Sequence, residues 1–107
     1  MISTHILDTS IGKPAEAVAV MLQIQDGNTW KDLSAGSTNA DGRFAFDCKN
    51  QPGVYRIIFS IEEYFKKNGR ESFFMNTPVI FKVADTNRKY HVPLLLNPFG
   101  YSTYRGS

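Results

Sequence analysis

The chain has 107 residues and a mass of 12.1 kDa, the length of a single domain, which excludes a second independent domain. Leu, Ile, Val and Phe make up about a quarter of the residues, above the roughly 20% below which chains tend to stay disordered. The 12 basic and 10 acidic residues are mixed along the chain and give a net charge of +2, which excludes the clustered basic surface of a nucleic-acid-binding protein. We therefore expect one folded domain over residues 1–107.

Stability, membrane association and compartment are also bounded by the composition. Cys48 is the only cysteine, so no intrachain disulfide is available and oligomerisation is the expected source of extra stability. The longest apolar run, Ala17 to Leu22, is far shorter than the roughly 20 residues of a membrane span, so we expect no membrane association. No basic region followed by an apolar core opens the sequence, which favours a cytoplasmic protein. The periplasm and the peroxisome are the alternatives if a signal has been removed.

The first half of the chain predicts short strands joined by tight turns. Apolar residues alternate with other residues over 18–24, the period of a strand with one buried face. Asp26-Gly27-Asn28 tolerates turn conformations, so residues 29–33 are expected to run back as the second strand of a hairpin. A second turn at residues 39–42 precedes a strand over 44–46 with its two Phe side chains on one face.

A break at Gln51-Pro52-Gly53 precedes another alternating strand and then a helix. Ser60 and Glu63 have the spacing of a capping box, in which the hydroxyl and the carboxylate each bond an unpaired backbone N–H. Acidic residues at the start of this segment, two lysines at its end and Gly69 beyond it fit the helix dipole and the C-terminal glycine rule. We expect one short helix near residues 61–68.

Two further strands are expected towards the C-terminus. Pro78 opens a segment in which alternate residues over 79–83 are apolar, and residues 90–96 form the last long strand. Pro93 cannot donate a hydrogen bond to a neighbouring strand, which predicts that it lies at a sheet edge or a bulge. Seven to eight short strands separated by turns favour an all-β fold, an antiparallel sandwich of two sheets.

Three residues are candidates for catalysis. His5 lies in the expected first strand and His91 in the last, and imidazole has a pKa of about 6.5 that suits proton transfer near neutral pH. First and last strands of a sheet can be neighbours, so the fold can bring both histidines beside Arg43, which follows the Asp41-Gly42 turn. A guanidinium there binds an oxyanion or orients an imidazole. Structural histidines and a solvated arginine are the alternatives.

Metal and thiol chemistry have weaker support. A zinc site needs three or four protein ligands, and neither Cys48 nor a carboxylate stands at a ligand-like spacing from the histidines, so we expect no metal. Cys48 is interpreted as a buried, inert thiol. The tail over residues 101–107 contains two tyrosines and an arginine, which predicts a docked segment. Tyr104 and Arg105 are then expected to line a pocket for a planar, polar ligand.

Three stretches carry a resemblance to a known family. They are Thr-His-Ile-Leu-Asp-Thr at residues 4–9 with Gly-Lys-Pro-Ala after it, Thr-Asn-Ala-Asp-Gly-Arg at residues 38–43, and the segment from Tyr90 to Ser107. With them the chain resembles the transthyretin-related family, the 5-hydroxyisourate hydrolases, along essentially its whole length. The closing Tyr-Arg-Gly-Ser resembles the feature that separates these hydrolases from transthyretin, a hormone carrier of the same fold.

The resemblance implies a transthyretin-like sandwich that needs no cofactor. It implies hydrolysis of a cyclic amide in 5-hydroxyisourate, a product of urate oxidation, to 2-oxo-4-hydroxy-4-carboxy-5-ureidoimidazoline. It also implies a homotetramer with its active sites between dimers. A non-catalytic transthyretin-like carrier or interaction module for small ligands is the alternative function, and an adhesin-like structural domain is a third.

Carried over residue by residue, the resemblance implies His5, Arg43 and His91 as catalytic residues. One histidine would be the general base, the other a proton donor or substrate anchor, and Arg43 would stabilise negative charge and orient an imidazole. The implied substrate-binding residues are those of the tail: Tyr104, Arg105, Gly106 and Ser107, whose carboxylate and hydroxyl would close the pocket.

Overall fold

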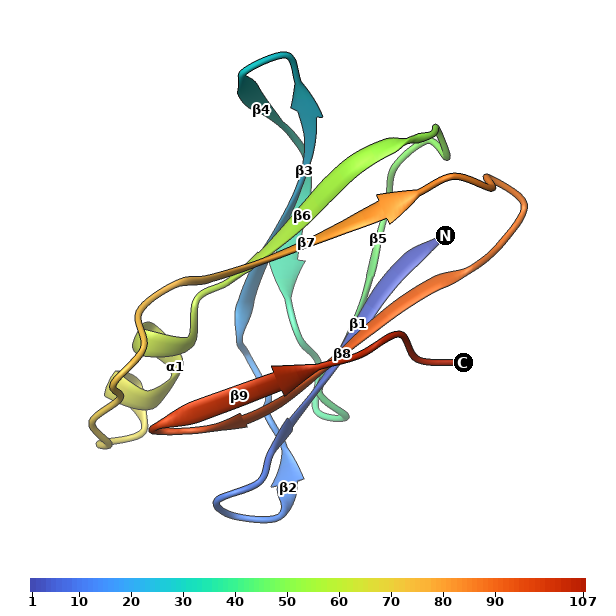
Figure 1. The fold of residues 1–107 in the computed structure, drawn as a ribbon. Coiled ribbons are helices and arrows are strands. Elements are labelled where there is room, and N and C mark those ends of the chain that lie inside the picture. The colour runs from blue at the N-terminus through green and yellow to red at the C-terminus, as the bar shows by residue number, and fades with distance from the viewer.

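Two β-sheets face each other in the structure, a computed structural model that describes all residues from Met1 to Ser107 (Figure 1). The first sheet has the path β2-β1-β8-β9, with β5 also paired to β1; its strands are β1 (Ile2–Asp8), β2 (Lys13–Pro14), β5 (Arg43–Phe46), β8 (Tyr90–Asn97) and β9 (Gly100–Thr103). The second sheet has the order β4-β3-β6-β7; its strands are β3 (Ala19–Asp26), β4 (Thr29–Ser37), β6 (Gly53–Phe59) and β7 (Thr77–Val83). The sandwich class predicted from the sequence is confirmed, and the short strands β2 and β9, which had no predicted counterpart, bring the count to nine.

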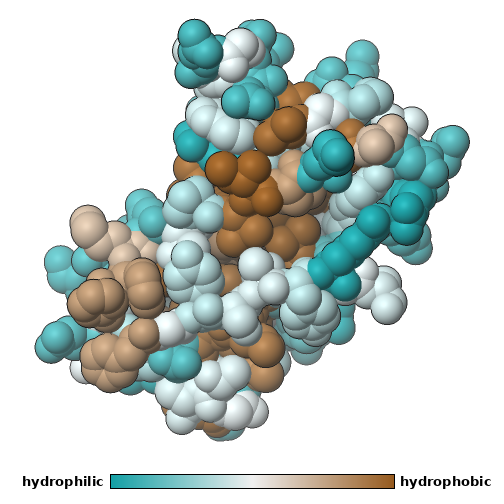
Figure 2. Space-filling view, viewed as in Figure 1, coloured by the Kyte–Doolittle hydropathy of each residue, from teal (hydrophilic) through white to brown (hydrophobic).

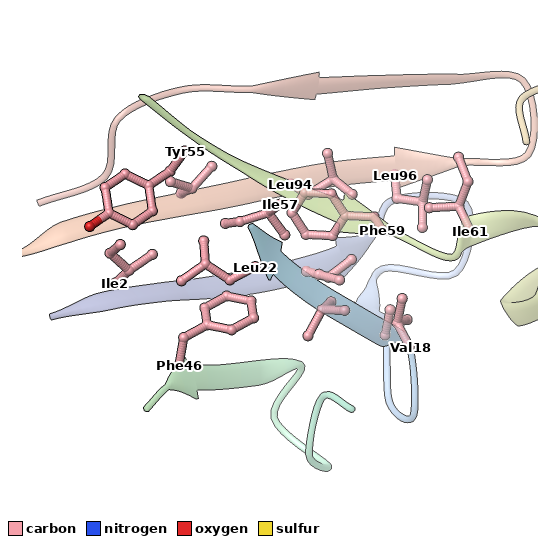
Figure 3. Close-up of a cluster of buried hydrophobic side chains, with 14 of the residues drawn as sticks. Ile2, Val18, Leu22, Phe46, Tyr55, Ile57, Phe59, Ile61, Leu94 and Leu96 are labelled. Atoms are coloured by element: carbon pink, nitrogen blue, oxygen red, sulfur yellow. The ribbon is translucent and has the colours of Figure 1, made fainter. Parts of the chain in front are cut away.

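The core lies between the two sheets because alternate residues of their strands are apolar. In β1 and β3 the inward-facing residues are buried and their neighbours are more exposed. Figure 3 shows the inward-facing side chains of both sheets meeting in one cluster. The fully buried members with the largest side chains are Tyr55, Phe59, Phe65, Ile6, Leu22, Ile57, Ile61, Leu94 and Leu96.

The single helix, α1 (Ile61–Lys67), confirms the expected helix and covers one end of the sandwich (Figure 1). Its acidic first turn and basic last turn are also confirmed, and Gly69 has a φ of +71°. The capping box is wrong, because the side chain of Ser60 makes no capping hydrogen bond. The backbone N–H of Ser60 instead donates to the carbonyl of Ala19 at 3.0 Å, so β3 already satisfies this donor. No helix of the structure is long and apolar enough to cross a membrane.

One pair of strands departs from the antiparallel expectation. β1 and β8 run parallel, in the register Ser3 to His91 and His5 to Pro93, whereas all other pairs are antiparallel. Between β1 and β8 the chain forms all four strands of the second sheet. The two strands are therefore not connected by a hairpin turn, which would make them antiparallel. This parallel pair places two segments that are 88 residues apart side by side.

Pro93 lies at an interruption of strand pairing within the sheet. The sequence predicted that Pro93 lies at a sheet edge or a bulge. The edge alternative is wrong, because β8 is an inner strand between β1 and β9. Pairing with β9 ends at Leu94 with Thr103 and resumes only as an isolated bridge between His91 and Gly106. The missing N–H of Pro93 therefore coincides with the gap in this ladder, as a bulge-like position requires.

Candidate active site

His5 and Arg43 meet on the outer face of the first sheet. They are direct partners in the antiparallel pair of β1 with β5. His5 is half-buried between the buried residues Thr4 and Ile6, so it faces away from the core. Arg43 begins β5 as the sequence predicted, and its backbone N–H donates to Oδ1 of Asn39 at 3.0 Å. The turn before β5 thus determines where the guanidinium leaves the sheet.

The parallel pairing of β1 with β8 brings His91 to the same face. Ser3 is the register partner of His91, and its Oγ lies 2.9 Å from Nδ1 of that histidine. His5 follows Ser3 by two residues and points to the same side, so the two imidazoles are diagonal neighbours across the strand pair. Both histidines and Arg43 therefore lie close together on this face. This proximity was expected from the sequence, because the first and last strands of a sheet can be neighbours.

Electrostatics keep His91 neutral. Its burial lowers the pKa of the imidazole below the usual 6.5, and the positive charges of Arg43 and His5 lower this pKa further. At neutral pH the ring therefore carries no charge and one of its nitrogens has a free lone pair. A neutral imidazole beside a guanidinium is suited to accept a proton from water while the guanidinium stabilises an anion.

The C-terminal tail docks onto this face, as its composition predicted. The backbone N–H of Gly106 donates to the carbonyl of His91 at 2.8 Å, and Thr103 Oγ1 donates to the carbonyl of Pro93 at 2.7 Å. Tyr104 and Arg105 lie between these two contacts, where the regular strand pairing is interrupted. The tail is thus anchored on both sides of Tyr104 and Arg105, the two residues expected to bind a ligand.

His91 borders two hollows that divide the expected binding residues between them. A cavity of about 220 Å³ between β7 and the tail contains Tyr104 and Arg105, and the guanidinium of Arg105 stacks over the ring of Tyr90 at 4.7 Å. The brown strip across Figure 2 marks the apolar character of this region. A second hollow, of about 300 Å³ on the outer face, brings Ser107 together with His91 and Arg43.

Several residues of the outer hollow were missed by the sequence analysis, and two of them share a face with a candidate histidine. Ser3 and Lys89 both line it, and neither has a recognisable motif around it. Lys89 lies two positions before His91, and Ser3 lies two positions before His5. Residues two apart in a strand point to the same side, so each shares a face with a candidate histidine. Counting two residues back from each histidine along its strand would have identified Ser3 and Lys89 from the sequence. His5 itself is adjacent to this hollow through Arg43 but does not line it.

Metal ligation finds no support in the geometry. No group of three or more His, Cys, Asp or Glu side chains is arranged to hold a metal ion. Cys48 is partly buried against the core, and this burial raises the pKa of its thiol. The functional groups gathered in the outer hollow are the imidazole of His91, the guanidinium of Arg43, the ammonium of Lys89 and the hydroxyls of Ser3 and Ser107.

Comparison with known proteins adds three relationships. The model of the family described as HIUase/Transthyretin matches residues 2–106. A 5-hydroxyisourate hydrolase of Salmonella typhimurium is 46% identical over 110 residues, which cover 100% of this chain and 81% of the relative. A 5-hydroxyisourate hydrolase of Mus musculus is 39% identical and is covered over 94% of its length.

Solved structures agree with the family match. The structure of Klebsiella pneumoniae 5-hydroxyisourate hydrolase superposes with a TM-score of 0.88 at 39% identity, covering 99% of this chain and 98% of that one. Sea bream transthyretin in complex with thyroxine superposes with a TM-score of 0.92 at 30% identity, covering 98% of this chain and 93% of that one. The same fold thus occurs in a hydrolase and in a thyroxine-bound protein, and the site has to distinguish them.

Proposed function

The chain belongs to the HIUase/Transthyretin family, and we propose that it hydrolyses 5-hydroxyisourate to 2-oxo-4-hydroxy-4-carboxy-5-ureidoimidazoline in urate degradation. The observation that carries this proposal is the convergence of His5, Arg43 and His91 on one face. A binding protein needs no neutral imidazole beside a guanidinium, whereas amide hydrolysis needs a proton acceptor and a stabiliser of negative charge. The hydrolase relatives are also more similar to this chain in sequence than the thyroxine-bound transthyretin is.

His91 is the general base in this mechanism. Its lowered pKa leaves it neutral, so it takes a proton from water as the water oxygen bonds to the carbonyl carbon of the cyclic amide. Negative charge then develops on the carbonyl oxygen, where the guanidinium of Arg43 stabilises it. The C–N bond breaks, the ring nitrogen receives a proton with His5 as the donor, and a carboxylate is left on the opened ring.

The tail holds the substrate beside these groups. Ser107 shares the outer hollow with His91 and Arg43, which suits it to hydrogen-bond a polar edge of the ring. Tyr104 and Arg105 lie on the other side of His91 and offer stacking and planar hydrogen bonds to a purine-derived ring. Gly106 joins the two sides through its backbone bond to His91.

The decay of 5-hydroxyisourate tests the proposal. The compound is generated in situ from urate and urate oxidase, and its decay is followed by ultraviolet absorbance with and without the protein, since it also decays unaided. We expect the wild type to accelerate this decay and His91→Asn to lose about 10²-fold or more of the rate, as removal of a general base does. Ser37→Ala, on the exposed end of β4, is the matched control and should retain full activity.

An unchanged decay at micromolar protein contradicts the hydrolase and favours the carrier. In that case His91→Asn and Arg43→Ala should leave the binding of small aromatic ligands largely intact. Acceleration that survives both substitutions contradicts the residue assignment while leaving the reaction in place.

We further propose that the chain assembles as a homotetramer with its active sites between dimers. The similarity to transthyretin structures supports this assembly. Tyr104 of the neighbouring cavity is 57% exposed, and the hollow with His91 and Arg43 opens on the outer face of the first sheet. A partner subunit over this face would exclude water from the hollow. Sedimentation velocity at assay concentrations measures the mass; an active monomer would contradict the proposed assembly.

A further inference from the structure

Ser3 makes the single side-chain hydrogen bond to His91, and nothing in the mechanism above assigns it a role. We propose that Ser3 is a positioning residue, whose hydroxyl holds Nδ1 of His91 so that Nε2 is the nitrogen that accepts the proton from water. This inference rests on the proposed hydrolysis, because it concerns the orientation of the general base. Its structural half, the proton position on His91, can be measured without substrate.

The ring of His91 is confined on several sides. Ser3 Oγ lies 2.9 Å from Nδ1, and the backbone of Gly106 packs so closely that a Cβ there would stand 2.5 Å from Cδ2. The same position would be 3.0 Å from Cγ of Pro93, so the tail, the proline and the imidazole are in close contact. No protein group bonds Nε2. The confinement therefore leaves one ring nitrogen free and holds its direction.

The direction of the Ser3 bond follows from what the base must do. A neutral imidazole has one N–H and one lone pair, and the bond made by one nitrogen decides which nitrogen carries the proton. If Nδ1–H donates to Ser3 Oγ, the lone pair is on Nε2. When Nε2 then takes a proton, Nδ1–H still donates to the same hydroxyl, and the bond strengthens because the donor is now charged. One hydrogen bond thus serves both the resting ring and the imidazolium.

The register of the strands explains why a residue at position 3 performs this task. Ser3 and His91 are direct partners in the parallel pair, and both side chains point to the outer face. Ser3 also lines the outer hollow with His91 and Ser107, so it borders the proposed substrate site. The neighbouring residues Ile2 and Thr4 are buried in the core, which holds this part of β1 in place.

Several charged groups lie near His91, and two of them affect its titration. Arg43 of β5 and His5 of β1 disfavour its protonation. Lys89 borders the same outer hollow, and Lys82 of β7 and Arg105 of the tail border the other one. Because Ser3 carries no charge, its removal leaves this set unchanged. An effect of Ser3→Ala on the proton position of His91 is therefore an effect of the hydrogen bond.

The experiment compares Ser3→Ala and Ser3→Thr with the wild type and with Ser37→Ala as a matched control on exposed β4. We expect Ser3→Ala to lower kcat about 10-fold, the size of one neutral hydrogen bond, with KM changed less than about twofold. Ser3→Thr keeps a hydroxyl and should restore most of kcat. Thermal unfolding of each variant separates a loss of folding from a loss of orientation.

Nitrogen-15 NMR of the histidine side chains provides the readout that a merely structural serine would not change. In the substrate-free wild type, neutral His91 should carry its proton on Nδ1, and Ser3→Ala should move population to the tautomer with the proton on Nε2. A proton on Nε2 in the wild type, or an unchanged kcat in Ser3→Ala, overturns the inference. If the wild type shows no turnover at all, the proposed function fails instead, and the tautomer measurement still tests the contact.

Discussion

Gly106 packs against the imidazole of His91 so closely that a Cβ atom at position 106 would lie 2.5 Å from Cδ2 and 3.3 Å from Cγ of the ring. Such a separation is shorter than carbon atoms tolerate without displacement. The same glycine donates its N–H to the carbonyl of His91 at 2.8 Å. The tail and the proposed base are therefore positioned together, and neither can move without the other.

This contact predicts that Gly106→Ala impairs catalysis far more than folding. The added methyl group has to displace either the imidazole or the tail, and a displacement of about 1 Å at a reacting group can cost about 10²-fold in rate. Gly100→Ala is the matched control, because its Cβ would meet only Asn97, at 3.8 Å or more. Steady-state kinetics and thermal unfolding measure both effects. Full activity of Gly106→Ala would mean that the contact does not position His91.

Local patterns in the sequence predicted the elements of this fold but not how distant strands meet. The hairpin of β3 and β4 and the helix α1 follow from alternation, turn residues and charge, which act over a few positions. The pairing of Ser3 with His91 joins residues 88 apart, and no local pattern encodes that these strands run parallel. The convergence of the histidines was predictable as a hypothesis, whereas the partner at Nδ1 depends on this register.

The tail shows the same division. Its composition predicted docking, and the bridge between His91 and Gly106 confirms it. The side to which each tail residue turns was not predictable, because Pro93 interrupts the ladder and frees residues 104 and 105 from strand alternation. As a result Arg105 stacks over Tyr90, away from the hollow that contains Ser107.

The titration of His91 is expected below its usual range and to depend on Arg43. Burial and the neighbouring charges lower the pKa of His91, so the folded chain binds this proton less tightly than the unfolded chain does. This histidine therefore disfavours folding as the pH falls below about 6.5, and the acid limb of kcat/KM should lie below that value. Arg43→Gln removes one positive charge and should raise the pKa, although burial still holds it under 6.5.

Proton NMR of the two histidines measures this pKa directly. His5→Gln leaves one histidine and thereby assigns the signal of His91. Because His5 also lowers the pKa of His91, this variant should itself titrate slightly higher than the wild type. A midpoint for His91 at or above 6.5 in the wild type, or one that Arg43→Gln does not move, would contradict this electrostatic account.

Asp8 is expected to stabilise the end of the sandwich near α1 in a pH-dependent way. Burial alone would raise its pKa, but hydrogen bonds from Ser10, Arg70 and Tyr64 hold this pKa below the usual value. Arg70 Nη2 lies 2.6 Å from Oδ2 of Asp8, which is fully buried, and the hydroxyl of Tyr64 donates to the same oxygen at 2.8 Å. Burial and the hydrogen bond to this carboxylate raise the pKa of Tyr64 to about 12.

Asp8→Asn should lower the free energy of unfolding by about 3 kcal/mol at pH 7, because Arg70 and Tyr64 then lose the carboxylate that they contact. A lowered carboxyl pKa contributes stability that is complete above the ordinary value near 4 and is lost as the pH falls through the folded value. Chemical denaturation should therefore show the difference between wild type and variant shrinking below about pH 4. Asp47→Asn, at an exposed position, should show no such difference at any pH. A gap that does not narrow in acid would contradict the assignment to this carboxylate.

Gly42, the one glycine of the turn that presents Arg43, is expected to tolerate substitution poorly. Its φ of +73° is unfavourable for other residues, and a Cβ there would overlap the backbone carbonyl oxygen of Ile6. Gly69 has nearly the same φ, +71°, but open space around its Cβ position. The two glycines therefore share a backbone conformation but differ in their steric surroundings. Comparing them separates the cost of backbone strain from the cost of the steric overlap.

Gly69→Ala should cost about 1 kcal/mol of unfolding free energy, the strain of a left-handed alanine, and should leave turnover unchanged. Gly42→Ala carries the same strain and adds an overlap with the backbone of β1, for a total of about 3 kcal/mol. Because β1 carries His5 and the displaced residue precedes Arg43, turnover should fall as well. Urea denaturation and the 5-hydroxyisourate assay measure the pair of effects on the two variants. Equal losses of stability in both would show that the approach of Gly42 to Ile6 is not what holds the turn against β1.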